Sequence, residues 1–332
     1  MDPHHLIIVA FQTQLVPAPK FDLPAPYTCE VREYTQTSLD EIPERIRDAH
    51  VVTLSTLRLD ASVLDPAVSP RLKMVAVVAS GTDCIDLAAC RARGVAVSNT
   101  PHCNSRSVAE HTIALYFDLR RSVTLSHTLT RAGQWPIRAT LTRSLNGPDG
   151  RPPRTCRSET IGIVGYGALG KMIESIARDL GMKVLISGRK EESDAPEGRT
   201  PFDAVIKEST VIALCVPQTP GTIDLISEPE FAAMGPHALV INVSRAGIVN
   251  EDALIAALKA RRIAGAAVDV YPKEPADPDS CRLLGPETEG LNLVTTPHVA
   301  WVAEDTNRNY QAVLLGNLST WLTTGRAKNH VA

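Results

Sequence analysis

The stretch Thr160-Ile161-Gly162-Ile163-Val164-Gly165-Tyr166-Gly167-Ala168-Leu169-Gly170 decides the fold of this 332-residue chain. Residues 160–164 are mainly apolar and β-branched, as in a buried strand, and the turn that follows has the spacing G-x-G-x-x-G. Residues 171–180 carry apolar side chains at helical spacing, and residues 183–186 are typical of a second strand. This order of strand, glycine turn, helix and strand predicts a βαβ unit that binds a dinucleotide.

Each glycine of the turn has an expected role. Gly165 permits the tight turn, Gly167 lets the backbone approach a pyrophosphate, and Gly170 allows the helix to pack closely on the strand. The phosphates are expected on the free amides at the helix start, where Ala168 and Leu169 lie. The alternative is an ordinary glycine-rich turn, and the flanking strands and helix argue against it.

The composition excludes several classes of function. The chain is 44% hydrophobic and 21% charged, with a formal net charge of -3, so nothing favours binding to nucleic acid or to an anionic membrane. No apolar run approaches the length of a membrane helix, and residues 1–11 lack the pattern of a signal peptide. The seven cysteines and nine histidines show no metal-ligand spacing. We therefore expect a cytoplasmic protein with reduced thiols and no metal.

Apolar segments of strand length occur on both sides of the glycine turn, separated by helical patterns. The expected strands before it are residues 6–11, 51–54, 74–78 and 95–97, and those after it are residues 211–214, 238–243, 264–270 and 293–295. Long helices are expected at residues 105–121, which would cross from the first unit to the second, and at residues 304–322. Residues 132–159 are expected to form a loop, because glycines and prolines lie among polar residues there. The chain length and this order predict two α/β domains with parallel sheets.

Three polar residues follow three of the expected strands, at the edge where doubly wound sheets bind their ligands. Arg245 can hold a carboxylate through two parallel hydrogen bonds. His298 can protonate a carbonyl oxygen as hydride reaches the carbon, and Glu274 would favour the protonated imidazole. Each residue alone has an ordinary structural explanation, but their joint position predicts catalytic roles.

These motifs resemble the D-isomer-specific 2-hydroxyacid dehydrogenases over almost the whole chain. The similar segments, in order, are residues 79–86, 94–101, 107–111, 165–170, 242–247, 269–275 and 297–301. The resemblance implies a flavodoxin-like substrate domain, residues 1–101 and 299–332, and a Rossmann-like NAD(P)-binding domain, residues 102–298. Both would be doubly wound parallel sheets of the α/β class. The short, polar segment 191–200 and the long segment 146–157 depart from the family pattern.

The resemblance also implies site residues beyond the three polar ones. Ser80 and Gly81 would hold the substrate carboxylate through their backbone amides. Asp269 would contact the nicotinamide carboxamide. The remaining positions that the family uses to line the cofactor are Val216, Pro217 and Val243.

The residues 297–301, Pro-His-Val-Ala-Trp, most resemble the glycerate dehydrogenase and glyoxylate reductase branch. The resemblance implies NAD(P)H-dependent reduction of a small 2-oxo acid, such as hydroxypyruvate or glyoxylate, to the D-2-hydroxy acid. It also implies a homodimer formed around residues 108–135. The alternative is a nucleotide-sensing, corepressor-like interaction protein of the same fold, because such proteins keep the three polar residues.

The second strand of the nucleotide unit indicates which cofactor is used. NAD enzymes place an acidic residue about 20 residues beyond the glycines, whereas an arginine there accommodates a 2′-phosphate. This chain has Ser187, Gly188, Arg189 and Lys190 at that point, with the glycine at the usual place of the acid. The glycine would make room for a phosphate, and its neighbours would supply a hydroxyl and positive charge. We therefore predict a preference for NADP(H), with NAD(H) as the second option and a solvent-exposed basic strand end as the structural alternative.

Overall fold

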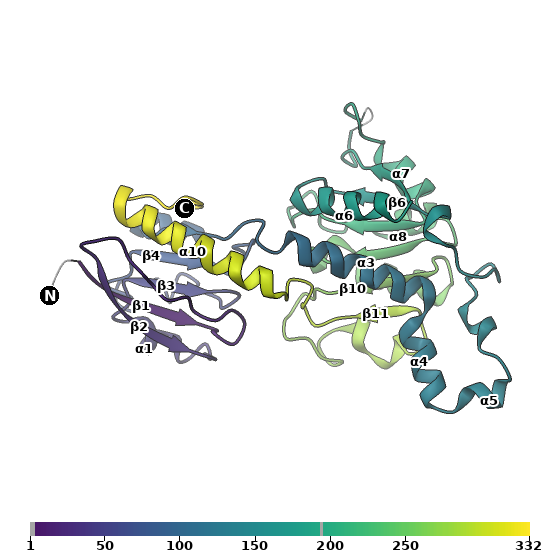
Figure 1. Cartoon of the computed structure of the whole chain (residues 1–332), viewed down its shortest axis with the longest axis horizontal. Helices are drawn as coiled ribbons and strands as arrows, with labels where there is room; N and C mark the ends of the chain where they lie inside the picture. Colours follow the sequence, from purple (N-terminus) through teal and green to yellow (C-terminus); the bar gives the residue numbers. More distant parts are fainter. Residues whose placement is uncertain (1–3, 193–194) are drawn as a thin grey trace. The chain divides into compact units, whose positions relative to one another are not determined.

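The chain divides into two compact units. The computed structural model describes residues 4–192 and 195–332. Met1–Asn104 and Val302–Ala332 make one unit, and Ser105–Trp301 make the other. Each unit contains one parallel sheet with helices on its faces (Figure 1), which confirms the predicted α/β class with two doubly wound sheets. The short segment 191–200 is described only in part, because positions 193 and 194 lie outside the described residues.

The larger unit is built on a six-stranded sheet in the order β11-β10-β9-β8-β6-β7. The strands are β6 (Thr160–Val164), β7 (Lys183–Ile186), β8 (Val211–Leu214), β9 (Leu239–Asn242), β10 (Gly265–Val268) and β11 (Leu293–Thr295). All pairs between these strands are parallel. β7 lies on one side of β6, and the next strand along the chain, β8, lies on the other side of β6. The strand order therefore reverses between β6 and β8. Doubly wound sheets bind nucleotides at the carboxyl ends of the strands at such a reversal.

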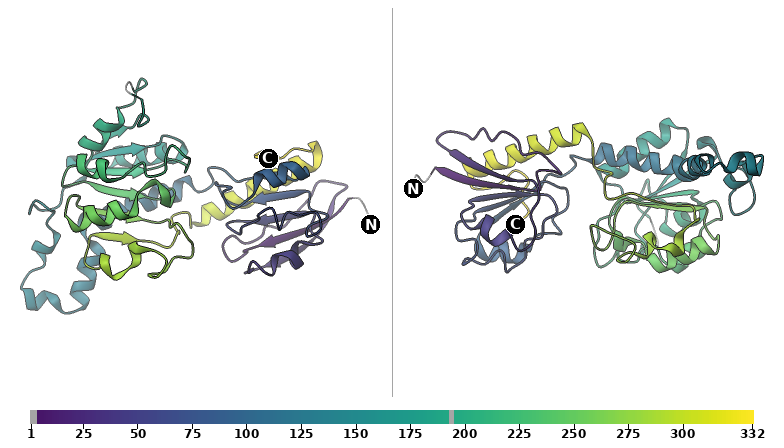
Figure 2. Two further views of the ribbon diagram at one scale, coloured as in Figure 1. Left: turned by 180° about the vertical axis from the view of Figure 1, so that it is seen from behind. Right: turned by 90° about the horizontal axis from the view of Figure 1, so that it is seen from below.

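Both faces of this sheet are buried, which explains the continuous apolar strands. In β8, Val211 and Ala213 pack with α3 (Ser105–Arg121) and α6 (Ala168–Asp179). The alternate residues Ile212 and Leu214 pack in a second core on the opposite face. The helices of that second core are α7 (Phe202–Glu208), α8 (Glu228–Ala233) and α9 (Glu251–Lys259). The view from below in Figure 2 shows the helices on both sides of the strands.

The chain enters the larger unit before α3 begins, so α3 lies wholly within that unit. The expectation that this helix crosses between the units was therefore wrong. The loop predicted for residues 132–159 was also partly wrong. It follows α4 (Val123–Arg131) and contains α5 (Gln134–Arg138) and two single 3₁₀ turns, η1 (Thr142–Leu145) and η2 (Cys156–Ser158). The helix α5 is short and has no buried residue, so no apolar stripe marked it in the sequence.

The smaller unit has a five-stranded sheet in the flavodoxin-like order β2-β1-β3-β4-β5. Its strands are β1 (His5–Phe11), β2 (Thr28–Tyr34), β3 (Val51–Leu54), β4 (Met74–Val77) and β5 (Ala96–Ser98). One face packs against α1 (Ile42–Ile46) and α2 (Leu87–Arg93), and α10 (Glu304–Thr324) runs alongside the other (Figures 1 and 2). The sequence missed β2, because this edge strand is polar and none of its residues is fully buried.

Candidate active site

The glycine turn lies at the reversal of the strand order, between the ends of β6 and β8. Gly165 has a φ of +97°, and a Cβ added there would stand 2.6 Å from the carbonyl oxygen of Cys215 and 2.7 Å from Cγ1 of Val216. Only glycine fits a turn with this backbone angle and this close approach. A Cβ at Gly167 would meet nothing within 4 Å, so the surface of the turn is open there.

The helix α6 starts directly from this turn. It has Gly167 as its N-cap, and no side chain caps its first amides. Those amides are the groups that bind phosphate at a helix N-terminus. Gly170 packs against the carbonyl of Gly165 with no room for a side chain, which brings the helix close to the strand. The turn therefore offers an open, uncapped helix start at the edge where the sheet binds ligands.

The end of β7 carries the four residues that we expect beside the cofactor ribose. Ser187 is buried and its hydroxyl donates to the carbonyl of Gly188 at 2.7 Å. A Cβ at Gly188 would stand 3.2 Å from Cβ of Ala195 and 3.6 Å from the carbonyl oxygen of Thr200. The room beside Gly188 is therefore limited by the chain itself, contrary to the expectation that glycine opens space for a phosphate. The effect of glycine at position 188 is that no acidic side chain stands there.

The two basic residues at this strand end differ in their environment. Lys190 Nζ lies 2.7 Å from Oε1 of the buried Glu230 and 3.2 Å from the carbonyl oxygen of Leu225. Arg189 is 87% exposed, and its Nε lies 3.8 Å from Glu192. The charge of Lys190 is thus neutralised within the fold, whereas Arg189 extends into solvent.

Arg245 lies at the carboxyl end of β9, on a turn that Asn242 holds in place. The side-chain amide of Asn242 donates to the carbonyl of Arg245 at 2.8 Å, and its oxygen accepts the amide of Ser244 at 3.1 Å. One guanidinium nitrogen of Arg245 donates to the carbonyl of Ser244 at 2.8 Å. Val243 is buried beside this turn, and Val216 and Pro217 follow the neighbouring strand β8.

Glu274 and His298 come together at the adjoining strand ends. Oε2 of Glu274 lies 2.6 Å from Nδ1 of His298, and Oε1 accepts the amide of Tyr271 at 2.9 Å. Their side chains are 32% and 35% exposed, so the pair borders solvent. Burial acts to raise the pKa of Glu274, but hydrogen bonds from His298 and the Tyr271 amide, with the charges of His298 and Arg245, outweigh it and lower the pKa. Glu274 is therefore a carboxylate at neutral pH, with Nδ1 of His298 as its partner.

Asp269 holds the backbone that carries His298. It is 1% exposed, and its carboxylate accepts the amides of Val299 and Ala300, each at 3.0 Å, and the hydroxyl of Thr296 at 2.6 Å. His298 itself has a φ of +53°, which is uncommon for a residue other than glycine. The sequence motif marked Asp269 as a cofactor residue. It gave no sign of these contacts, because they form only when the segment after β11 folds back against Asp269.

Two further residues surround this network. Nε2 of His111, on α3, lies 3.2 Å from the hydroxyl of Thr296. Nε1 of Trp301 donates to the carbonyl of His298 at 2.9 Å. The polypeptide on both sides of His298 is therefore held by hydrogen bonds to buried or half-buried groups.

The expected substrate loop lies in the smaller unit, after β4. The carbonyl of Ser80 accepts from Nδ2 of Asn99 at 2.7 Å, and the hydroxyl of Ser80 donates to Oδ1 of Asn104 at 3.2 Å. Gly81 follows Ser80 in the same loop. Further along this loop, the carbonyl of Cys84 accepts a hydrogen bond from the amide of Leu59. The loop is thus fixed within its own unit.

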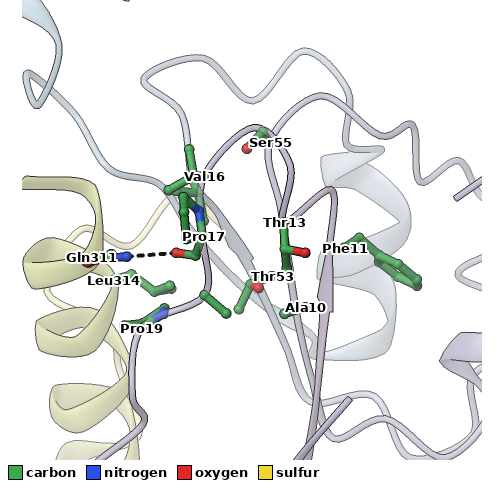
Figure 3. Close-up of a pocket in the computed structure, with 12 residues that line it drawn as sticks. Ala10, Phe11, Thr13, Val16, Pro17, Pro19, Thr53, Ser55, Gln311 and Leu314 are labelled. Atoms are coloured by element: carbon green, nitrogen blue, oxygen red, sulfur yellow. Dashed lines mark hydrogen bonds between the residues drawn. The ribbon is translucent and has the colours of Figure 1, made fainter. Parts of the chain in front are cut away.

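A small cavity in the smaller unit is not a candidate substrate site. It lies at the ends of β1, β3 and β4, and Gln311, which donates to the carbonyl of Pro17, lies on its wall (Figure 3). Its volume of about 10 Å³ is close to the least space that holds one water molecule. Neither Ser80 nor Gly81 lines it.

The described residues show neither a metal-ligand cluster nor a membrane-spanning helix. No group of three or more histidine, cysteine or acidic side chains in residues 4–192 and 195–332 is placed to hold a metal ion. Over the same residues, every helix is too short or too polar to cross a bilayer.

Comparison with known proteins identifies the family. The sequence model of the D-isomer specific 2-hydroxyacid dehydrogenase NAD binding domain matches residues 113–300. The glycerate dehydrogenase of Methylorubrum extorquens is 34% identical over 303 residues, which cover 91% of this chain and 92% of the relative. The chain belongs to the D-isomer specific 2-hydroxyacid dehydrogenase family. This confirms the family that its motifs resemble, and the protein is an oxidoreductase that uses a nicotinamide cofactor.

Other relatives agree with the branch and the fold. The glyoxylate reductase of Pyrococcus furiosus is 33% identical over 265 residues, which cover 78% of this chain and 75% of the relative. Among solved structures, the NADPH-dependent glyoxylate/hydroxypyruvate reductase of Sinorhizobium meliloti in complex with citrate has a TM-score of 0.75. It is 24% identical, with 98% of each chain covered, and supports the fold. The 2-hydroxyacid dehydrogenase family and its glycerate/glyoxylate branch are thus the ones that the sequence predicted.

Proposed function

We propose that this dehydrogenase reduces a small 2-oxo acid to the D-2-hydroxy acid, with His298 as the general acid. The observation that carries the proposal is the 2.6 Å contact between Glu274 and Nδ1 of His298. This contact occupies one ring nitrogen and leaves Nε2 for proton transfer. A bound nicotinamide supplies the hydride. Arg245 holds the substrate carboxylate, and His298 delivers its proton to the carbonyl oxygen as that oxygen gains negative charge.

The two units would divide this work. We propose that residues 1–101 and 299–332 form the substrate domain and that residues 102–298 form the nucleotide-binding domain. The observed division of the chain falls at nearby positions in the sequence, between residues 104 and 105 and between residues 301 and 302. In this assignment the amides of Ser80 and Gly81 bind the substrate carboxylate, and Asp269 borders the nicotinamide while it holds the His298 segment.

The substrate we propose is hydroxypyruvate or glyoxylate. The glycerate dehydrogenase and glyoxylate reductase relatives support this choice. The test is the loss of absorbance of the reduced nicotinamide with glyoxylate, hydroxypyruvate, pyruvate and phenylpyruvate. Highest kcat/KM with one of the first two supports the proposal, and highest kcat/KM with another acid contradicts it. Silence with all four would favour the nucleotide-sensing interaction protein.

The cofactor we propose is NADP(H). The end of β7 has no acidic residue at Gly188 and presents the exposed Arg189, with the hydroxyl of Ser187 nearby in the chain. Lys190 is paired with Glu230, so its contribution to a phosphate would be smaller than we expected from the sequence. Steady-state kinetics with both cofactors tests the preference, and an enzyme that prefers NADH would disprove it.

We also propose a cytoplasmic homodimer. All seven cysteines are free thiols, as in a reducing compartment. Exposed large apolar side chains gather on the end of α3 and on α4 and α5, namely Phe117, Val123, Leu125, Trp135 and Ile137. Such a cluster on a globular protein is typical of a protein interface.

Sedimentation tests the assembly. A dimer at micromolar concentration that dissociates in a Trp135→Ser, Ile137→Ser variant supports the interface on α5. Leu39→Ser removes an exposed apolar side chain from the smaller unit and serves as the matched control. A monomeric wild-type protein would show that the dimer proposal is wrong.

A further inference from the structure

One cation beside the glycine turn has no role in the mechanism above. Thr200 forms a parallel bridge with Ser187, and its amide donates to the carbonyl of Ile186 at 2.7 Å. The amide of Gly188 in turn donates to the carbonyl of Thr200 at 2.8 Å. Thr200, which lies just before α7, is therefore paired with the carboxyl end of β7. This pairing sets the position of Arg199, the residue directly before Thr200.

The side chain of Arg199 lies over the glycine turn. Its Cζ is 4.6 Å from the ring centroid of Tyr166, the residue between Gly165 and Gly167. A guanidinium over an aromatic face is attracted by the negative charge of the ring face. Arg199 is half-buried in this position. It therefore connects the two parts of the nucleotide site, the phosphate-binding turn and the end of the second strand.

The tyrosine ring is itself held from the helix behind it. The hydroxyl of Tyr166 donates to Glu174 on α6, and Arg178 donates to the same carboxylate at 2.9 Å. Glu174 is thus already paired. Among the described residues, no carboxylate lies within ion-pair distance of Arg199. In the part of the chain that the structure describes, the guanidinium of Arg199 therefore has no ion-pair partner.

We infer that Arg199 is a second cation for the cofactor 2′-phosphate, opposite Arg189. The inference rests on the proposed NADP(H) preference. The pyrophosphate of a dinucleotide lies at the glycine turn and the adenosine ribose at the end of the second strand, so a charge fixed between them faces the 2′ position. Arg189 is highly exposed and must be ordered by the cofactor, whereas Arg199 is already placed on Tyr166. Preorganised groups lose less entropy on binding, so Arg199 would carry a large share of the discrimination.

Binding of nucleotide fragments to the full-length enzyme tests this inference. Calorimetry with adenosine 2′,5′-bisphosphate and with adenosine 5′-monophosphate isolates the contribution of the 2′-phosphate. We expect Arg199→Ala to weaken binding of the bisphosphate by about 10- to 150-fold, the value of one charge-assisted hydrogen bond. Binding of the monophosphate should remain unchanged, and Arg199→Lys should restore part of the loss.

Two further variants separate position from charge. Arg178→Ala removes a positive charge that is paired with Glu174 near the same tyrosine, and we expect little change with either nucleotide. Tyr166→Leu removes the ring under Arg199, and we expect a loss for the bisphosphate that is smaller than that of Arg199→Ala. Equal losses for both nucleotides in Arg199→Ala, or no loss for either, would overturn the inference.

The same experiment distinguishes this inference from the proposed function. If the wild-type enzyme binds both fragments equally and prefers NADH, the NADP(H) proposal fails and this inference fails with it. If the wild-type enzyme prefers NADPH and Arg189→Ala loses that preference while Arg199→Ala keeps it, only the role of Arg199 is disproved.

Discussion

Glu274 Oε2 lies 2.6 Å from Nδ1 of His298, across 24 residues of the chain. A carboxylate in this position stabilises the protonated imidazole and fixes the orientation of the ring. Its lowered pKa keeps Glu274 ionised over the whole range in which an imidazole titrates. The pair therefore holds the ring of His298 through Nδ1 and leaves Nε2 for proton donation.

The first prediction concerns Glu274→Gln. Loss of the negative charge destabilises the protonated imidazole, so reduction should lose activity at a lower pH than in the wild type. We expect the descending limb of the pH profile of kcat/KM to move towards acid. The rate at the acidic end of the profile should be nearly retained. An unshifted profile would show that Glu274 has a structural role only.

The second prediction concerns His298→Ala. General acid catalysis contributes roughly 10²- to 10⁴-fold, so kcat for reduction should fall by a factor in that range. The dissociation constant of the cofactor, measured by fluorescence titration, should change little, because the glycine turn and the end of β7 remain intact. Near-normal turnover would contradict the assignment of the proton donor.

Arg245 should behave differently from His298. Removal of the guanidinium in Arg245→Ala takes away the expected partner of the substrate carboxylate, so both KM and kcat should worsen. Arg245→Lys keeps the charge but loses the two parallel hydrogen bonds, and we expect it to recover only part of the loss. A pure kcat effect with unchanged KM for the oxo acid would argue against carboxylate binding.

The next prediction concerns Arg189→Ala. Hydrogen bonds to charged groups contribute about 1.5–3 kcal/mol, so kcat/KM with NADPH should fall by roughly 10- to 150-fold. Efficiency with NADH should hardly change, because no 2′-phosphate is present. Lys190→Ala is a useful comparison, since its partner Glu230 lies in the capping box of α8. It should lower thermal stability more than it alters the cofactor preference. Equal loss with both cofactors in Arg189→Ala would refute the assignment.

The last prediction concerns Asp269→Asn. The carboxylate accepts three hydrogen bonds within the protein, and the amide nitrogen of asparagine would face at least one donor. Unfolding in urea should show a loss of about 1–3 kcal/mol, the cost of an unsatisfied buried group. Turnover should fall as well, because the same contacts position the backbone after His298. Asp203→Asn, on α7, is a control far from these contacts in the chain, and it should leave both stability and turnover near wild type.

Much of the fold and of the site could be predicted from local sequence patterns. Strands β3, β6, β7, β8 and β11 have the bounds expected from their apolar runs. The inner strands β3, β6 and β8 are almost continuously apolar because they are buried on both faces. The glycine spacing also predicted the βαβ unit that β6, α6 and β7 form. The pairing of Glu274 with His298 could be expected because both follow neighbouring strands of one sheet edge.

The sequence by itself therefore determined the fold class, the family and the positions of all described strands except β2, since these depend on residue type and short-range spacing. Only the tertiary structure decided which charges are available at the site. Glu230, 40 residues after Lys190, neutralises that lysine, and Tyr166 holds Arg199 near the end of β7. The pattern around Asp269 likewise could not show that its carboxylate binds the amides of Val299 and Ala300. Such contacts join residues far apart in the chain, and their formation depends on the packing of the whole unit rather than on any local motif.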